Sequence, residues 1–144
     1  MRELLGRCNV RVATVVAISA LGVVLGAGAA GATVSTFTVD PRATLSVGGT
    51  QVTLTGSITC ASGDQVYIAG GVIETVGRLQ RTAIGFNNPT IISCSGAAQP
   101  WSATFISDTS LRLLPGPANA DVFWSDVTDF TFATVATEVR LAPR

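Results

Sequence analysis

A ten-residue segment near the middle of the chain constrains the fold more than any other feature. Residues 51–60 read Q-V-T-L-T-G-S-I-T-C, with Val, Leu, Ile and Cys on one parity and Thr or Ser on the other. This alternation is typical of a β-strand that buries one face and exposes the other. Because successive side chains in a strand point to opposite faces, the pattern turns Cys60 toward the buried face.

The rest of the sequence favours strands as well. Between residues 33 and 144, 35 residues are Thr, Val or Ile, whereas nine are Leu or Glu and none is Lys or Met. β-Branched residues favour strands, and the depleted types favour helices. Further strands are predicted at 65–75, 78–86, 90–95, 101–107, 118–124 and from about 130 to 141.

Two local breaks are expected within this pattern. Gly70-Gly71 predicts a β-bulge, and Leu114-Pro115-Gly116-Pro117 is expected to lie outside helices and central strands. Seven to nine short strands at this spacing predict an all-β fold, an immunoglobulin-like β-sandwich of antiparallel strands spanning residues 33–144.

The first 32 residues predict a signal peptide. Arg2, Arg7 and Arg11 make the start positive, residues 12–25 are apolar, and residues 26–32 contain only Gly and Ala. A positive start, an apolar middle and a small-residue end are the signal-peptide layout. Ala30 and Ala32 predict cleavage before Thr33, and a cut three residues earlier also fits.

A retained membrane anchor is the alternative for this leader. The uncharged run from Val12 to Ala32 is long enough to span a bilayer. However, its last seven residues are only Gly and Ala, and no basic residue follows until Arg42. We therefore expect a secreted or cell-envelope domain with no membrane span after cleavage.

Two cysteines, Cys60 and Cys94, remain beyond the leader. In an exported chain an even number of cysteines predicts a disulfide, and two cysteines allow one pairing. The alternative is a pair of free buried thiols. The loop is about 35 residues long, so the bond would stabilise the fold by ~4 kcal/mol on the chain-entropy estimate.

The charged residues exclude several functions. Residues 33–144 carry six Arg against six Asp and two Glu, a net charge of −2, and the whole chain contains no Lys and no His. This balance offers no basic surface for nucleic acid or for an anionic membrane. Without His or Lys there is no imidazole base, Ser-His pair, Schiff base or histidine-ligated metal site. We expect no enzyme activity and no cofactor, with a carboxylate pair as the one remaining catalytic option.

Two motifs have simpler interpretations than their chemistry suggests. Residues 26–31 match the glycine pattern of dinucleotide sites, but Thr-rich, strand-like sequence and Pro41 follow them instead of a helix pattern, so the leader explains them. Asp108, Asp121, Asp126 and Asp129 form the densest acidic group, and a calcium site there is the alternative to acids at a solvated strand edge. We expect the second interpretation and no metal.

The aromatic residues are interpreted mainly as core. Strand parity from Ala118 turns Trp124 inward and therefore turns Phe123 outward, where Phe123 is the candidate for a surface interaction patch. Trp101 is expected inside. The other aromatic side chains interpreted mostly as core are Tyr67, Phe86, Phe130 and Phe132.

Three segments carry a resemblance to a group of small exported actinobacterial proteins. They are G-S-I-T-C at 56–60, C-S-G-A-A-Q-P-W at 94–101 and P-G-P-A-N-A-D-V-F-W at 115–124. The group resembled has one cysteine pair and no assigned activity. More distantly, the chain resembles the neocarzinostatin-type apoproteins, secreted immunoglobulin-like sandwiches with two disulfides that bind a chromophore.

Together these observations predict a non-catalytic secreted or cell-envelope domain that binds a protein or envelope component, or serves a structural role. The alternative is a carrier of an apolar small molecule in a cleft of the sandwich. An exposed patch containing Phe123 would favour a protein partner, an apolar cleft would favour the carrier, and two carboxylates in a groove would favour catalysis.

Removal of the leader is directly testable. Protein recovered after export should begin near Thr33 when its intact mass is measured, because the small residues at 30 and 32 fit signal peptidase. Membrane-bound protein that still begins at Met1 would show that the leader is an anchor.

Overall fold

The computed structural model describes residues 24–25, 34–85, 90–107, 111–127 and 131–144. The predicted cleavage sites, Phe86, Asp108, Asp129 and Phe130 lie outside these residues. Every regular element in the described part of the chain is a strand, which confirms the all-β prediction, and none of it is a helix able to cross a bilayer. The strands are β1 (Val24–Leu25), β2 (Val34–Val39), β3 (Arg42–Leu45), β4 (Gln51–Cys60), β5 (Gln65–Val76), β6 (Leu79–Ile84), β7 (Thr90–Ser93), β8 (Gln99–Ser107), β9 (Gly116–Asp126) and β10 (Phe132–Pro143).

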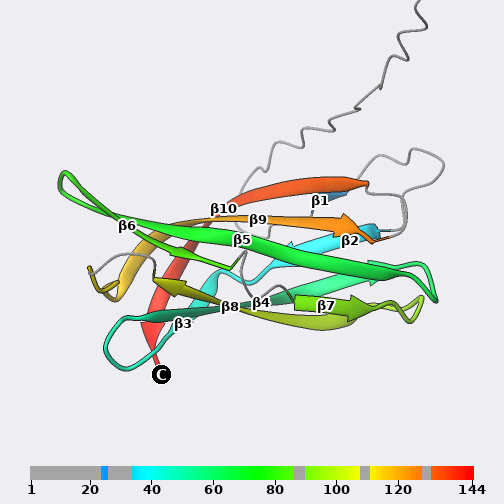
Figure 1. The fold of residues 1–144 in the computed structure, drawn as a ribbon, viewed down its shortest axis with the longest axis horizontal. Coiled ribbons are helices and arrows are strands. Elements are labelled where there is room, and N and C mark those ends of the chain that lie inside the picture. Colours follow the sequence, from blue (N-terminus) through cyan, green and yellow to red (C-terminus); the bar gives the residue numbers. More distant parts are fainter. Residues whose placement is uncertain (1–23, 26–33, 86–89, 108–110, 128–130) are drawn as a thin grey trace, which may run out of the picture.

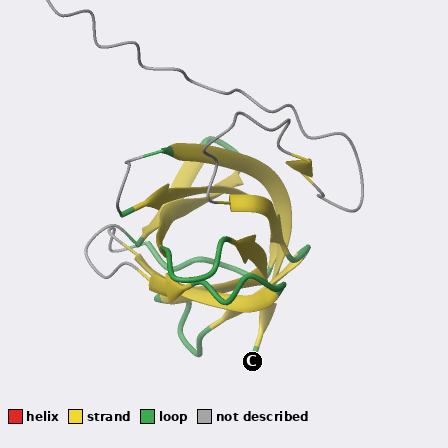
Figure 2. Cartoon of the chain, turned by 90° about the vertical axis from the view of Figure 1, so that its right-hand side faces the viewer, coloured by secondary structure: helices red, strands yellow, loops and turns green. Residues whose placement is uncertain are grey.

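Seven of the described strands close into a barrel in the order β4-β3-β10-β9-β5-β6-β8 (Figures 1 and 2). Strands β4 and β8 pair over a long stretch, from Gln51 to Ile58 on β4. The ring is completed where Ala83 and Ile84 of β6 pair with the end of β8. The structure therefore differs from the expected immunoglobulin-like sandwich, because this last pairing joins what would otherwise be two free strand edges.

The pairing is antiparallel except between β3 and β10, which run parallel from Arg42 to Leu45. Strand β4 has two partners on the edge opposite β8, since β3 pairs with its start and β2 with its second half. Likewise β5 pairs with β9 on one edge and with β7 and then β6 on the other. These two long strands thus hold most of the sheet together.

The barrel interior is filled with side chains. The predicted alternation of β4 is confirmed, with Val52, Leu54, Ile58 and Cys60 buried and the intervening hydroxyl residues facing outward. The largest fully enclosed side chains are Trp101, Phe105, Leu54, Ile58, Ile68, Leu113 and Leu141.

Trp101 connects three strands inside the barrel. Its ring stacks on Phe37 of β2, with centroids 5.1 Å apart, and its Nε1–H donates to the carbonyl oxygen of Thr38 at 2.9 Å. The indole lies against Gly56 of β4, where a Cβ would stand 2.7 Å from Nε1 and 1.9 Å from the Thr38 oxygen. Glycine at 56 is therefore required for β2, β4 and β8 to approach this closely.

The predicted disulfide is confirmed. Cys60 at the end of β4 is bonded to Cys94 just after β7, with the Cα atoms 5.4 Å apart. Backbone hydrogen bonds surround it, since Cys94 donates to Asp64 O at 2.9 Å and accepts from Gly63 N at 3.1 Å. The bond fixes the β7 segment to the turn between β4 and β5.

One of the two local predictions was wrong. The register of β5 against β9 runs without a shift through Gly70 and Gly71, so there is no bulge between these strands. Gly70 is instead needed because a Cβ would stand 2.1 Å from Asp121 O. The prediction for residues 114–117 is confirmed, because Leu114 and Pro115 lie outside strands and Gly116-Pro117 begin β9 where it pairs with β10 alone. Pro117 is tolerated because β5 pairs with β9 only from Asn119 onward, so this part of β9 is an edge.

Candidate functional site

A groove crosses the outer face of β5, β9 and β10. Gly71, Asp121 and Ala136 lie in register across these strands, and the small residues on both sides of Asp121 leave space above the sheet. The groove has a volume of about 440 Å³. It is lined by Ile73, Thr75, Gln80, Asn119, Asp121, Ala136, Thr137 and Glu138, and we call it the β5–β9–β10 groove.

Two carboxylates face this groove. Asp121 on β9 and Glu138 on β10 are both exposed, and Glu138 lies opposite Asn119, one diagonal step from Asp121. Diagonal neighbours in an antiparallel pair lie about 7–8 Å apart. Neither carboxylate has a hydrogen-bond or ion-pair partner among the residues the structure describes. The groove therefore holds two acceptor groups that are available to a ligand.

Amide and hydroxyl groups complete the lining. Asn119 and Gln80 contribute side-chain amides that donate and accept, and Thr75 contributes a hydroxyl. Ile73 gives one partly buried apolar surface between the polar groups. Apart from Ile73 and Ala136 every lining residue carries a polar side chain, so the groove offers several hydrogen-bonding groups to a polar ligand.

The two described members of the predicted acidic group, Asp121 and Asp126, do not meet at one site. Asp121 points outward into the groove, whereas Asp126 points inward and is 1 % exposed. Their opposite faces follow from strand parity, because they are five positions apart on β9, an odd number. In the described ranges no three acidic, His or Cys side chains gather as metal ligands would. The calcium interpretation gains nothing from Asp121 and Asp126.

Strand parity placed Trp124 and Phe123 on the expected sides of β9. Trp124 is buried in the core, and Phe123 lies on the outer face. Phe123 is half-buried rather than exposed, because its ring packs at a tilt against Tyr67 of β5 with centroids 5.8 Å apart. Tyr67 thus belongs to the outer face, although most of the aromatic residues were expected in the core.

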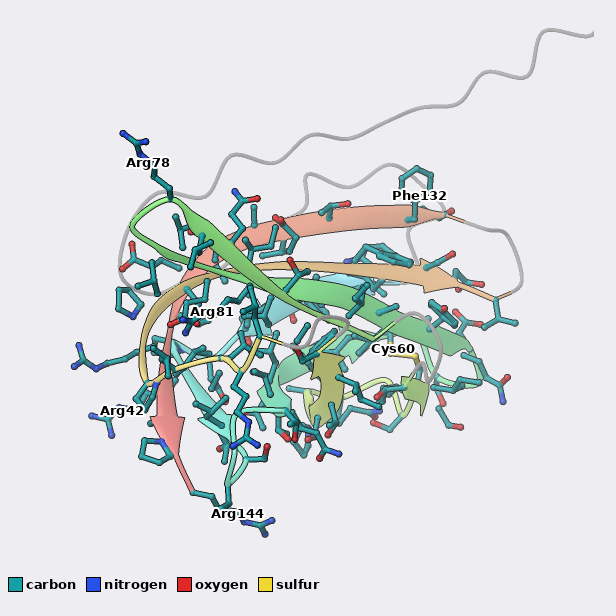
Figure 3. All side chains as sticks on the ribbon, turned by 60° about the vertical axis from the view of Figure 1, so that its left-hand side comes forward. Arg42, Cys60, Arg78, Arg81, Phe132 and Arg144 are labelled. Atoms are coloured by element: carbon teal, nitrogen blue, oxygen red, sulfur yellow. A yellow bond between two sulfur atoms is a disulfide. The ribbon has the colours of Figure 1, made fainter. Side chains whose placement is uncertain are left out.

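Phe132 is an exposed aromatic residue that the sequence interpretation placed in the core. Its side chain is 44 % exposed and projects outward from the start of β10 (Figure 3). It pairs with Ser125, two positions along β9 from Phe123. Applying to β10 the parity rule used for β9 would have turned Phe132 outward, since Val135 and Val139 are the buried positions.

A buried ion pair supports one side of the groove from inside the barrel. Glu74 on β5 is 3 % exposed, lies between the groove residues Ile73 and Thr75, and pairs in register with Arg81 of β6. Arg81 Nη1 is 3.6 Å from Glu74 Oε2, which also accepts from the N–H of Leu114 at 3.0 Å. The β5–β6 hairpin is thereby fixed to the segment before β9.

The sequence analysis missed this pair, although the signal was present. Val66, Ile68 and Val72 define the buried parity of β5, and Glu74 continues it. A buried carboxylate requires a partner, and Arg81 is the cation that a short hairpin turn brings opposite it. Arg78 lies at the tip of the same hairpin and points away from the body (Figure 3).

The chain matches no protein-family model, and no curated protein sequence matches it. The resemblances to the exported actinobacterial group and to the neocarzinostatin-type apoproteins therefore stay predictions.

The two neighbouring aromatic residues of β9 should differ in their contribution to stability. Trp124→Ala should lower the free energy of unfolding by roughly 3–5 kcal/mol, because it removes a large buried side chain. Phe123→Ala should cost no more than about 1.5 kcal/mol, the order of one aromatic pair contact. Denaturant unfolding of the two variants measures both values, and a larger loss at Phe123 would contradict the assigned faces.

Proposed function

We propose that this chain is a non-catalytic binding domain that works outside the cytoplasm, free or attached to the cell envelope. The observation that carries the proposal is the β5–β9–β10 groove, where Asp121 and Glu138 are exposed diagonal neighbours on adjacent strands with no partner among the described residues. Sites that bind polar ligands combine a concave surface with a few converging polar groups, and this groove has both.

The lining indicates the class of ligand. Carboxylates accept hydrogen bonds or pair with cations, and the amides of Asn119 and Gln80 both donate and accept. Two negative charges without a counter-charge in the groove repel an anionic ligand. We therefore expect a neutral or cationic polar ligand, such as a sugar chain or an amine-bearing chain of an envelope component.

The same geometry argues against catalysis by a carboxylate pair and against a carrier of apolar molecules. A glycosidase-type pair needs one carboxyl group in an apolar environment that keeps it protonated, and Asp121 and Glu138 are both open to solvent. A carrier of apolar molecules needs an apolar cleft, whereas this groove carries two exposed carboxylates and the barrel interior is filled by side chains such as Trp101 and Phe105.

The proposed location and ancestry have separate support. A disulfide between Cys60 and Cys94 suits an oxidising compartment, in agreement with the predicted leader. We propose an immunoglobulin-like origin for the barrel, with β2-β4-β8 on one side and β10-β9-β5-β6 on the other. The disulfide departs from the immunoglobulin pattern, because Cys94 follows β7 rather than lying on a strand facing β4.

Binding can be tested with glucosamine oligomers, which are cationic, their N-acetylated counterparts, which are neutral, and polyglutamate, which is anionic. Two-dimensional NMR titration should show shifts at Asn119, Gln80 and the neighbouring backbone with the first or second probe and none with polyglutamate. Asp121→Asn combined with Glu138→Gln should weaken binding at least about tenfold, on the order of one charged hydrogen bond.

Asp64→Asn is the matched control for this experiment. Asp64 precedes β5, at the end of the strand opposite Thr75, and is not part of the groove lining. Its replacement should leave the titration unchanged. Failure of both saccharide probes to shift the groove signals, or equal binding by the double variant, would contradict the proposal.

A further inference from the structure

Among the described strands, one edge of β2 is covered only by β1, which lies in the predicted leader. Along one edge it pairs with β4 from Val34 to Val39, and along the other its one partner among the described strands is β1, through Val24↔Phe37 and Leu25↔Thr36 (Figure 1). Strand β1 belongs to the segment expected to be removed during export. When it is removed, no other described strand covers this edge.

The backbone groups at this edge follow from the pairing with β4. Asp40 donates its N–H to Thr55 O of β4 at 2.8 Å, and the Thr38 carbonyl accepts from Trp101 within the barrel. Because N–H and C=O groups alternate between the two edges of a strand, Phe37 and Val39 direct theirs to the opposite edge. The pairing of Phe37 with β1 agrees with this assignment.

Nothing in β2 protects the edge against pairing with another chain. Its sequence V-S-T-F-T-V has no charge, Pro or Gly. Natural edge strands usually carry such residues, and an unprotected edge is a template for a further strand. The β1 contact already demonstrates antiparallel pairing there.

We propose that the β2 edge joins two copies of this protein by antiparallel β2–β2 pairing after the leader is removed. Antiparallel pairing of a strand with itself is the geometry of a two-fold symmetric dimer. The proposal rests on leader removal, but it is independent of the proposed ligand, because no groove residue lies on β2.

The register of this pairing is determined by the strand itself. Phe37 of one copy pairs with Val39 of the other, which uses the outward N–H and C=O groups of both residues. A two-residue shift one way requires the N–H of Pro41, which proline lacks, and the other way requires Ser35, beside the irregularity between Val34 and Thr36. A one-residue shift places buried-face side chains opposite outer-face ones.

Thr38 consequently lies opposite Thr38 of the second copy, on the two-fold axis. This central pair is of the non-hydrogen-bonded type, with Cα atoms about 4.5 Å apart. The facing side chains are uncharged, so the wild-type pair has no repulsion to overcome. A charged side chain introduced at position 38 would face the identical charge of the second protomer, so substitutions of Thr38 test the proposed pairing directly.

Thr38→Lys and Thr38→Glu test the proposal in exported protein whose mass confirms that the leader is absent. Sedimentation velocity of the wild type should show a monomer–dimer equilibrium that depends on protein concentration. Each variant alone should raise the dimer dissociation constant at least about tenfold, because like charges meet across the axis. An equimolar mixture of the two variants should restore dimerisation, since opposite charges then face each other.

Thr104→Lys and Thr104→Glu are the matched controls. Thr104 is an exposed hydroxyl on β8 whose side chain is hydrogen-bonded across the strands to Thr53, as that of Thr38 is to Ser57. These variants should dimerise as the wild type does, alone and mixed. A Thr38→Cys variant adds a charge-free measurement, because mild oxidation should cross-link two copies there and should not cross-link Thr104→Cys.

The outcomes that contradict the proposal are distinct. A wild type that stays monomeric up to about 1 mM has no useful self-affinity and overturns it. So do mixed charge variants that fail to dimerise, or a Thr38→Cys variant that does not cross-link. If the exported protein retains its leader, its mass reveals that leader removal is wrong, and the covered edge then contradicts the dimer without bearing on the groove.

Discussion

The packing of Trp101 onto Gly56 is the interaction on which the rest of the barrel depends. Because residue 56 has no side chain, the indole can lie directly on β4 and donate to the Thr38 carbonyl of β2. One side chain from β8 thereby aligns β2 with β4. An indole N–H enclosed without a partner would be costly, so the Thr38 oxygen is as important as the ring stacking on Phe37.

From this junction, the pairing of β4 determines where the polar surfaces lie. Its inward side chains build the core, and its outward hydroxyls are joined across strands, as Thr53 is to Thr104 at 3.2 Å. That face satisfies many of its own polar groups. The opposite face over β5, β9 and β10 differs, because Asp121 and Glu138 face a groove without partners. This contrast is why we place binding on the groove.

Much of the fold followed from local alternation. The bounds of β4, the inward Cys60 and the opposite faces of Phe123 and Trp124 were all predicted by period-two patterning. Closure of the barrel was not, because it depends on two residue pairs between β6 and β8 that are distant in sequence. Strands β2 and β3 were also missed, because both are short and Asp40-Pro41 separates them.

The candidate site was harder to predict than the fold for a physical reason. A groove forms where small residues from different strands come into register, as Gly71 and Ala136 do around Asp121, and register is not visible in a single strand. Two other residues could have been placed from the sequence. Strand alternation turns Glu74 of β5 inward and Phe132 of β10 outward, but the sequence analysis did not apply the alternation to either residue. The sequence interpretation considered each acidic residue by its neighbours along the chain, which grouped Asp121 with Asp126 instead of Glu138.

The free energy of unfolding of Gly56→Ala, measured by denaturant titration with the disulfide intact, tests the central role of this junction most directly. An added Cβ would stand 1.9 Å from the Thr38 oxygen, so we expect a loss of at least about 2 kcal/mol. Gly71→Ala is the control, because its Cβ would stand 3.2 Å from Ala83 O, and it should cost less than about 1 kcal/mol. Equal, small losses for both variants would contradict the account.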